Sequence, residues 1–270
     1  MPIDKAKPFV KWVGGKRSVM QSLLANVPSE INDYYEPFVG GGALFFEVQH
    51  LAKKCYLSDL NPDLIVAYKT IQTKPEQLIE RLTYHQSQHS EVYYRKIRAL
   101  QSLKDPLDNS ARFIYLMKTC YNGLYRVNNK GEFNTPVGNY KNPTICDADN
   151  IHAVSRRLQS VTIELGRFEC IKPKKGDFVY FDPPYHPTCQ ESFVKYVNQG
   201  FTEKDQEKLR DFALELYKQG VNVLISNSDT EYIRSLYKRP FNIVVISAPR
   251  AVNCKADKRQ KVNEVLIRGY

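Results

Sequence analysis

The segment from residue 34 to residue 59 limits the folds open to this chain more than any other part of its sequence. Its predicted elements are, in order, a strand at 34–39, a glycine turn at 40–42, a helix at 43–51, a strand at 54–58, the acid Asp59 and a turn into a helix near Pro62. Glycines permit a tight turn and let the backbone approach a ligand closely. This order predicts one half of a Rossmann-like α/β sheet.

The rest of the chain extends this pattern and interrupts it once. Further strands are predicted at 177–181, 221–226, 242–247 and 262–268, and helices at 203–217 and 229–237. Alternating strands and helices predict a mostly parallel sheet with helices on both faces. The interruption has helical periodicity at 76–103 and 109–120 and a hairpin signal, Asn129-Lys130-Gly131, within 121–143. We therefore expect one α/β domain, formed by 1–69 and 166–270, with a helical insert at 70–165 that carries a β-hairpin.

The composition is that of a basic protein with a hydrophobic core. The 270 residues carry a net charge of +10, which favours an anionic partner but decides little alone, because many soluble proteins are basic. Bases can stack on the 18 Tyr and 13 Phe, which are interleaved with Lys and Arg, although most of these rings are expected in the core. None of the 6 cysteines belongs to a CxxC pair, which argues against a zinc site. The sequence shows neither a secretory signal nor an apolar run long enough to span a membrane. We expect a cytoplasmic protein with reduced thiols and no metal.

The segment Asp182-Pro183-Pro184-Tyr185 has the most specific chemistry. It follows a predicted buried strand and combines an acid, two rigid prolines and an aromatic ring. The Asp182 carboxylate and the Pro183 carbonyl can each accept one N–H of a flat exocyclic amine, while Tyr185 stacks on the base. Acceptors on both N–H groups direct the nitrogen lone pair outward, toward an electrophile. The alternative is a structural Pro-Pro turn at the end of a strand.

Three segments in sequence order resemble the Dam-like family of DNA adenine-N6 methyltransferases. They are Lys11-Trp12-Val13-Gly14-Gly15-Lys16, Glu36-Pro37-Phe38-Val39-Gly40-Gly41-Gly42-Ala43 and Asp182-Pro183-Pro184-Tyr185, and the resemblance covers essentially the whole chain. It implies a Rossmann-like methyltransferase with a catalytic domain at 1–69 and 166–270 and a DNA target-recognition insert at 70–165. The implied reaction transfers a methyl group from S-adenosyl-L-methionine to N6 of an adenine flipped out of duplex DNA. The leading target is 5′-GATC-3′.

The glycine turn is not a nicotinamide fingerprint, because the third glycine position of G-x-G-x-x-G falls on Phe45. Asp59 follows about twenty residues later, where an acid can accept both hydroxyls of a ribose; capping of the next helix is the alternative. The resemblance completes the set of residues expected to bind S-adenosylmethionine: Trp12, Gly14, Lys16, Phe38, Gly40, Gly42, Asp59, Phe168 and Asp182. Lys16 is expected near the cofactor's carboxylate, with a surface lysine as the alternative, and Phe168 beside its adenine. Several relatives have Asp where this chain has Arg167, so no role is assigned there.

The resemblance also implies a set of DNA-binding residues: Lys11, Tyr121, Asn122, Leu124, Arg126, Pro136 and Tyr140. Lys11 and Arg126 would each contact a guanine in the major groove. The forked guanidinium of Arg126 would discriminate against other bases by about 1–3 kcal/mol. A surface hairpin without a DNA role, or an Arg126 buried in an ion pair, is the alternative.

The remaining DNA-binding residues would contact the duplex at and around the gap that the extruded base leaves. Tyr121 and Asn122 would fill the gap that it leaves, and Leu124 and Pro136 would contact an apolar group such as a thymine methyl. Tyr140 would touch the DNA backbone or the neighbouring base. Relatives often have Arg where this chain has Asn139, so one phosphate contact is in doubt.

The expected catalytic residues are Asp182, Pro183, Pro184 and Tyr185, with no metal and no nucleophilic side chain. Extruding the base costs a few kcal/mol, and phosphate contacts offset this cost. Asp182 would also stabilise the positive charge that develops on N6. Phe193 and Tyr196 would either close over the base or belong to the core.

Other functions stay open at the level of sequence. Cytosine-N4 methylation uses similar chemistry, although Asp182 favours adenine over cytosine. A nicotinamide oxidoreductase lacks the third glycine, and a DNA-binding protein without catalysis would not need an intact Asp182–Tyr185 segment. RNA methylation is disfavoured because the hairpin resembles one that reads the major groove. Double-stranded DNA is the expected partner, and a cognate restriction endonuclease is left open.

Overall fold

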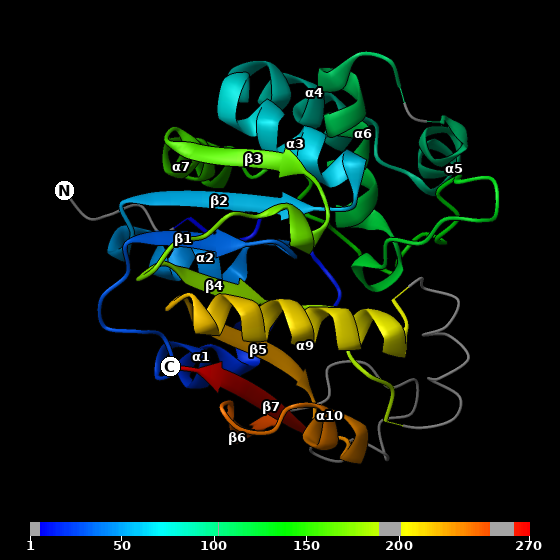
Figure 1. Cartoon of the computed structure of the whole chain (residues 1–270). Helices are drawn as coiled ribbons and strands as arrows, with labels where there is room; N and C mark the ends of the chain where they lie inside the picture. The colour runs from blue at the N-terminus through cyan, green and yellow to red at the C-terminus, as the bar shows by residue number, and fades with distance from the viewer. Residues whose placement is uncertain (1–5, 102, 189–200, 249–261) are drawn as a thin grey trace. The chain divides into compact units, whose positions relative to one another are not determined.

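The computed structural model describes residues 6–101, 103–188, 201–248 and 262–270 (Figure 1). Its strands are β1 Asp33–Glu36, β2 Lys54–Asp59, β3 Val161–Leu165, β4 Phe178–Phe181, β5 Asn222–Ser228, β6 Asn242–Ala248 and β7 Val262–Gly269. They form a seven-stranded sheet in the order β3–β2–β1–β4–β5–β7–β6. β1 is parallel to β2 and β4, and β4 to β5, whereas β7 is antiparallel to β5 and β6. The predicted α/β class is therefore confirmed.

Local sequence signals explain where several helices begin. The helices are α1 Met20–Leu24, α2 Ala43–Val48, α3 Pro62–Thr73, α4 Pro75–Gln88, α5 Glu91–Ala99, α6 Pro106–Thr119, α7 Ala148–Leu158, α9 Glu203–Lys218 and α10 Glu231–Leu236. Asn61 caps α3 by accepting a hydrogen bond from the Leu64 N–H. Thr202 and Asp205 form a capping box at the start of α9. The sequence patterns above do not predict α1, α7 or β3.

The described residues divide into two compact units. The first comprises the described parts of 1–15, 40–46 and 59–165. Its central helix is α6, which packs against α3, α4 and α5 and buries Phe113, Tyr115 and Leu116. The target-recognition insert predicted from the sequence begins at residue 70. That boundary was assigned by function and not by compactness, so it stays a prediction.

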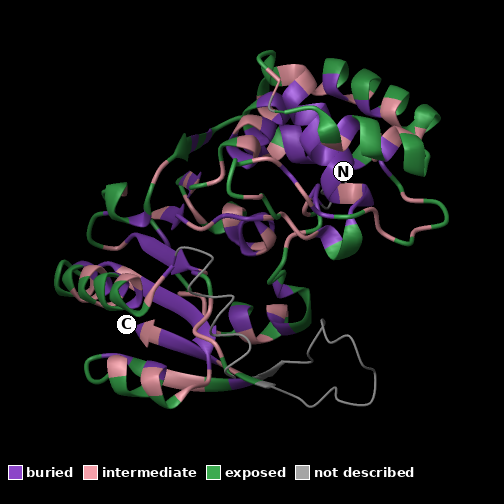
Figure 2. Ribbon diagram, turned by 90° about the vertical axis from the view of Figure 1, so that its right-hand side faces the viewer, coloured by how far each residue is buried: buried purple, intermediate pink, exposed green. Residues whose placement is uncertain are grey.

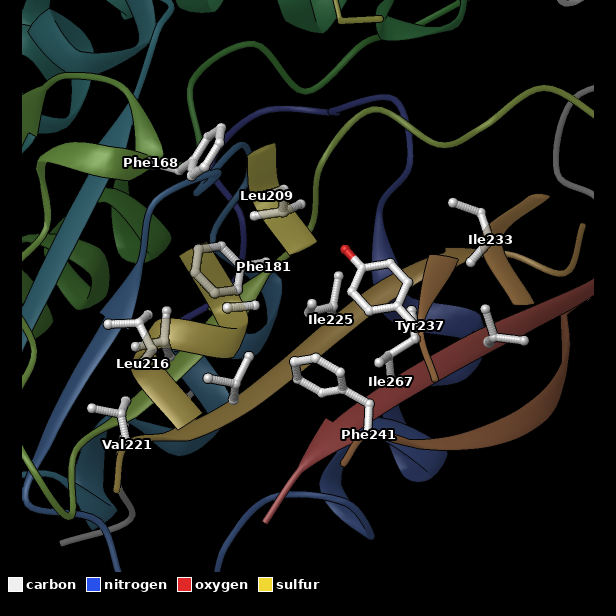
Figure 3. Packing of buried hydrophobic residues seen from close by; sticks show 14 of the residues in the cluster. Phe168, Phe181, Leu209, Leu216, Val221, Ile225, Ile233, Tyr237, Phe241 and Ile267 are labelled. Carbon is white, nitrogen blue, oxygen red and sulfur yellow. The ribbon is translucent and has the colours of Figure 1, made fainter. Parts of the chain in front are cut away.

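The second unit comprises the described parts of 16–39, 47–58 and 166–270. Its α9 packs against β5 and β7. Figure 3 shows the resulting core, in which Phe181, Leu209 and Ile225 belong to one hydrophobic cluster. All residues of β4 are buried, and Figure 2 shows buried residues in strands and in some helices, with exposed residues mostly in helices and loops. Asp182, the residue that follows Phe181, is therefore attached to the end of a strand that is buried on both faces.

The predicted hairpin is present in the first unit as a turn with isolated bridges. Val127 pairs with Phe133, and Cys120 pairs with Val137. Asn128 organises the turn, since its Oδ1 accepts hydrogen bonds from the N–H groups of Lys130 and Glu132. The 121–123 segment forms a short 3₁₀ turn, η3 Tyr121–Gly123.

None of the helices in the described ranges combines the length and the apolar character that a membrane span requires.

Candidate functional site

Asp182 directly follows β4, and the carboxyl ends of parallel strands are where α/β sheets bind ligands. The Lys16 Nζ lies 2.5 Å from Asp182 Oδ2, and the Lys16 side chain is only 7% exposed. Asp182 Oδ1 is buried and accepts no hydrogen bond from the described residues. Burial raises the pKa of Asp182, and the Lys16 ammonium opposes that rise. The carboxylate thus has one oxygen held by a cation and one suited to an incoming donor.

Tyr185 connects this carboxylate to β7. Its hydroxyl donates a hydrogen bond to Glu264 Oε2 at 3.1 Å. The Lys16 Nζ lies 5.0 Å from the centroid of the Tyr185 ring, in cation–π geometry. Burial raises the pKa of Glu264, and Lys16 opposes this rise as well. One lysine cation therefore interacts with Asp182, Tyr185 and Glu264 together.

An aromatic cluster in the second unit brings together two of the residues predicted to bind the cofactor. The Phe38 and Phe168 rings are stacked with centroids 5.6 Å apart, and Phe168 is only 2% exposed. Phe181 and Phe201 meet the Phe38 ring edge-on. Phe168 begins the 3₁₀ turn η4 Phe168–Cys170. Phe38 is half-buried, so its ring is the member of the stacked pair that offers apolar surface to a planar ring.

The first unit contains the glycine turn and its acid. Gly40 and Gly42 have φ of +46° and +67°, a region that favours glycine. Asp59 accepts hydrogen bonds from the N–H of Gly40, at 3.1 Å, and of Asn61, at 3.0 Å. Burial raises the pKa of Asp59, while the hydrogen bonds from Asn61 and Gly40 lower it. Since Asn61 caps α3, the structure does not give Asp59 that alternative role.

Trp12 packs directly on this turn. A Cβ at Gly40 would lie 2.6 Å from the Trp12 ring, so only glycine fits there. The Trp12 ring is also stacked with the Tyr125 ring, with centroids 6.2 Å apart. Gly14 has a φ of +85°, and the N–H of Gly15 donates to the carbonyl of Trp12, which closes a tight turn. The structure therefore places the predicted residues Trp12, Gly14, Gly40, Gly42 and Asp59 on two adjoining turns.

The predicted DNA-binding residues also lie in the first unit. The Lys11 Nζ is 4.2 Å from the centroid of the Tyr140 ring, and a Cβ at Gly123 would lie 2.5 Å from the Lys11 Cβ. The Tyr121 N–H donates to the carbonyl of Pro136 at 2.9 Å. Tyr121 itself is 47% exposed. The structure thus brings Lys11 and both sides of the hairpin together and leaves an aromatic ring in solvent.

Arg126 is exposed, which removes the alternative of an arginine buried in an ion pair. Its Nε donates to Asn134 Oδ1 at 2.6 Å and its Nη2 to the Asn134 carbonyl at 3.1 Å. The partner is neutral, and no ion pair with Arg126 is found in the part of the chain that the structure describes. The Leu124 carbonyl accepts a hydrogen bond from the Thr135 hydroxyl, which ties the two sides of the hairpin together. Asn122 is exposed with a φ of +54°.

Phe193 and Tyr196 lie outside the described residues. The sequence model of the family of D12 class N6 adenine-specific DNA methyltransferases matches residues 12–252 of this chain. The chain belongs to this family.

Relatives along the whole chain agree with this membership. The D12-class protein is 41% identical to the type II methyltransferase M1.LlaDCHI of Lactococcus lactis subsp. cremoris, over 98% of this chain and 95% of the other. It is 40% identical to the type II methyltransferase M.MjaIII of Methanocaldococcus jannaschii, over 98% and 100% of the two chains. The DNA adenine methylase of Vibrio cholerae is 33% identical, over 98% and 96%. The predicted resemblance is confirmed, and an oxidoreductase is not supported.

Two residues of the D12-class protein enter its candidate site without having been predicted. Glu264 is an acid directly before the apolar run Val265-Leu266-Ile267 of its strand, which is the signal that could have marked it. Lys118, in the last turn of α6, lines a surface hollow with Lys11, Tyr140 and Lys141. Burial lowers the pKa of Lys118, and the neighbouring cations Lys11 and Lys7 lower it further, against the effect of Asp147. The hollow is therefore strongly positive.

Proposed function

We propose that this D12-class protein transfers a methyl group from S-adenosyl-L-methionine to N6 of a flipped adenine in duplex DNA. The observation that carries the proposal is the buried Oδ1 of Asp182, at the end of β4 and without a hydrogen-bond donor among the described residues. A buried acceptor without a donor costs about 1–3 kcal/mol, so the site favours a ligand that brings an N–H group. An exocyclic amine supplies that group, and cytosine N4 is the less favoured candidate because the family is adenine-specific.

The residues around Asp182 can orient an amine for attack. Asp182 Oδ1 and the Pro183 carbonyl would accept its two N–H groups, and the Tyr185 ring would lie against the base. Positioning of this kind supplies most of what a methyl transfer requires from the enzyme. The carboxylate also stabilises the positive charge on N6 until a proton leaves. The Lys16 ammonium opposes the rise in the pKa of Asp182 that burial causes, and it therefore favours the charged carboxylate.

Taken separately, each unit carries groups suited to a part of S-adenosylmethionine, which supplies an electrophilic methyl group when bound. Asp59 would accept the ribose hydroxyls with the lone pairs that its backbone hydrogen bonds leave. Phe38 and Phe168 would border the adenine ring. The backbone at Gly40 and Gly42 would allow close approach of the methionine part. A contact of Lys16 with the cofactor carboxylate stays a prediction, since Lys16 pairs with Asp182 here.

The hairpin supports 5′-GATC-3′ as the proposed target. The exposed Arg126 presents a forked donor that matches the acceptors of guanine, and Lys11 offers a second cation nearby. Tyr121 is exposed enough to fill the gap that the flipped adenine leaves. Leu124 and Pro136 would meet an apolar group of the target. A cognate restriction endonuclease as partner, and a cytoplasmic location, stay predictions.

The test measures methyl transfer from labelled S-adenosylmethionine to two duplexes, one with a single GATC and one with GTTC. We expect label on the first duplex alone, and no detectable label with Asp182→Ala, which should still bind the cofactor. Equal label on both duplexes would discard the recognition roles of Lys11 and Arg126 but keep the reaction. No label on either, with cofactor binding shown separately, would overturn the proposed activity on this target. Substantial turnover by Asp182→Ala would overturn the role of its carboxylate.

A further inference from the structure

Two buried side-chain amides lie behind the Asp182–Tyr185 segment. Gln206 belongs to α9 and Asn227 to β5, and both are 0% exposed. Glutamine and asparagine are rarely buried completely, because each must satisfy two donors and one carbonyl oxygen away from water. Neither residue is explained by helix or strand formation, since apolar residues occupy most comparable positions of both elements. Their partners explain why they are there.

The two amides form one hydrogen-bonded circuit with the backbone around Tyr185. Gln206 Nε2 donates to the Pro184 carbonyl at 2.9 Å. Asn227 Nδ2 donates to Gln206 Oε1 at 3.1 Å, and Asn227 Oδ1 accepts from the His186 N–H at 3.0 Å. In each of these three hydrogen bonds a donor faces an acceptor. Rotating either side-chain amide by 180° would exchange its nitrogen and oxygen and break the circuit. The circuit therefore joins the carbonyl before Tyr185 to the N–H after it.

Other groups hold the same stretch of backbone less directly. Ser228 donates its hydroxyl to the His186 carbonyl. The His186 ring stacks on Tyr232 at 4.6 Å and contacts the Thr230 hydroxyl at 3.1 Å. These contacts fix the chain after Tyr185. Among the described residues, the Gln206–Asn227 pair reaches the backbone both before and after Tyr185.

We infer that Gln206 and Asn227 are positioning residues for methyl transfer. Gln206 binds the Pro184 carbonyl, one residue after Pro183, so it sets the direction in which the backbone turns after Pro183. That turn aims the Pro183 carbonyl and places the Tyr185 ring. The inference rests on the proposed function, because it concerns how the amine of the target base is held during that reaction.

The expected kinetic effect follows from how strictly methyl transfer depends on alignment. A displacement of about 1 Å can reduce a rate by about 10²-fold, even when the change lies behind the reacting groups. Loss of the circuit should therefore lower kcat by about 10–100-fold. The affinity for S-adenosylmethionine should change less than about twofold, since neither amide belongs to the residues expected to bind it.

The experiment compares Gln206→Met and Asn227→Leu with the wild-type protein. Both substitutions keep the volume roughly constant and remove the hydrogen bonds. The matched control is Gln72→Met, because Gln72 Nε2 also binds two backbone carbonyls, those of Leu158 and Val161, in the first unit. Single-turnover methyl transfer to the GATC duplex, cofactor affinity and the thermal unfolding midpoint are measured for each. Gln206→Asn, which keeps an amide but shortens its reach, serves as a second variant if Gln206→Met does not fold.

We expect both variants to fold, to bind the cofactor normally and to transfer methyl slowly, while Gln72→Met transfers at the wild-type rate. The double variant should be no slower than the slower single variant, because the two amides act as one unit. Wild-type single-turnover rates in folded Gln206 and Asn227 variants would overturn the inference. So would a rate loss in Gln72→Met as large as theirs, since it would show a general effect of lost stability. If the wild-type protein itself fails to methylate, the proposed function fails instead.

Discussion

Lys16 and Asp182 show how a single contact can set the chemistry of a site. A carboxylate that loses water is destabilised in its charged form, and a nearby cation restores part of that loss. In this protein burial raises the pKa of Asp182 and Lys16 lowers it. The proposed reaction needs an ionised Asp182, because only the carboxylate can accept the N–H and stabilise positive charge on N6.

Replacing Lys16 should therefore shift the pH dependence of methylation. The activity should rise with pH as Asp182 loses its proton, and removal of the cation in Lys16→Met raises the pKa of Asp182. The acidic limb of the kcat–pH profile should then move to higher pH, while activity at high pH is affected less. The measurement is the profile at saturating cofactor for the wild-type protein and Lys16→Met.

The pKa of Glu264 should rise in the same variant, since Lys16 also faces that carboxylate. Glu264→Gln is therefore the control that separates the two groups. If the acidic limb of the wild-type protein reports Glu264 rather than Asp182, the limb should disappear in Glu264→Gln. An unshifted limb in Lys16→Met would contradict the electrostatic role of the lysine.

At the scale of elements, the glycine turn depends on the side chain that packs on it. Gly40 needs glycine for two reasons: its φ of +46° and the Trp12 ring 2.6 Å from where a Cβ would lie. Gly131 in the hairpin has a φ of +77° but nothing within 4 Å of such a Cβ. Substitution of Gly131 therefore tests backbone strain alone, whereas substitution of Gly40 adds a steric conflict with the Trp12 ring.

Gly40→Ala should weaken cofactor binding by about tenfold or more, which corresponds to about 1.4 kcal/mol, since the Trp12 ring must move. Gly131→Ala should cost only the strain of a left-handed backbone, about 1–2 kcal/mol of folding stability. Titration with S-adenosylmethionine and chemical denaturation check the two effects. Equal cofactor affinity in both variants would show that contact between the turn and Trp12 is not needed for binding.

Local sequence signals alone were sufficient to predict some of the helices and turns. The helix predicted near Pro62 begins there, because Asn61 provides its cap within the same short stretch. The hairpin signal at residues 129–131 was correct about the turn, although the flanks pair only at isolated positions. Bridge pairing depends on residues on the other side of the loop, which no local pattern contains. β3 was missed because 161–165 was assigned to the helical insert.

At the scale of the whole molecule, we expect the net positive charge to contribute strongly to the affinity for DNA. The net charge of +10 and the positive hollow lined by Lys11, Lys118 and Lys141 favour phosphate contacts. DNA affinity should fall steeply with salt because binding releases counterions. For six to ten phosphate contacts the loss between 50 and 200 mM salt is about 10³–10⁵-fold. Affinity for S-adenosylmethionine should change far less over this range.

Fluorescence anisotropy with a labelled duplex, alongside cofactor titration, checks this contrast in the same buffers. Lys118→Gln should reduce the slope of log affinity against log salt by about one. A slope that matches the wild-type protein would show that Lys118 does not face phosphate. Equal salt dependence of cofactor and DNA binding would contradict the electrostatic account as a whole.

The sequence by itself determined the α/β class, the family and the segments that carry the chemistry. It could do so because each signal is contiguous: the glycine turn, Asp182–Tyr185 and the hairpin turn each lie within a few residues. Only the tertiary structure decided the pairing of Lys16 with Asp182, the bond from Tyr185 to Glu264 and the Gln206–Asn227 circuit. These contacts join residues far apart in the chain, and the packing of strands and helices, rather than any local preference, brings them within hydrogen-bonding distance.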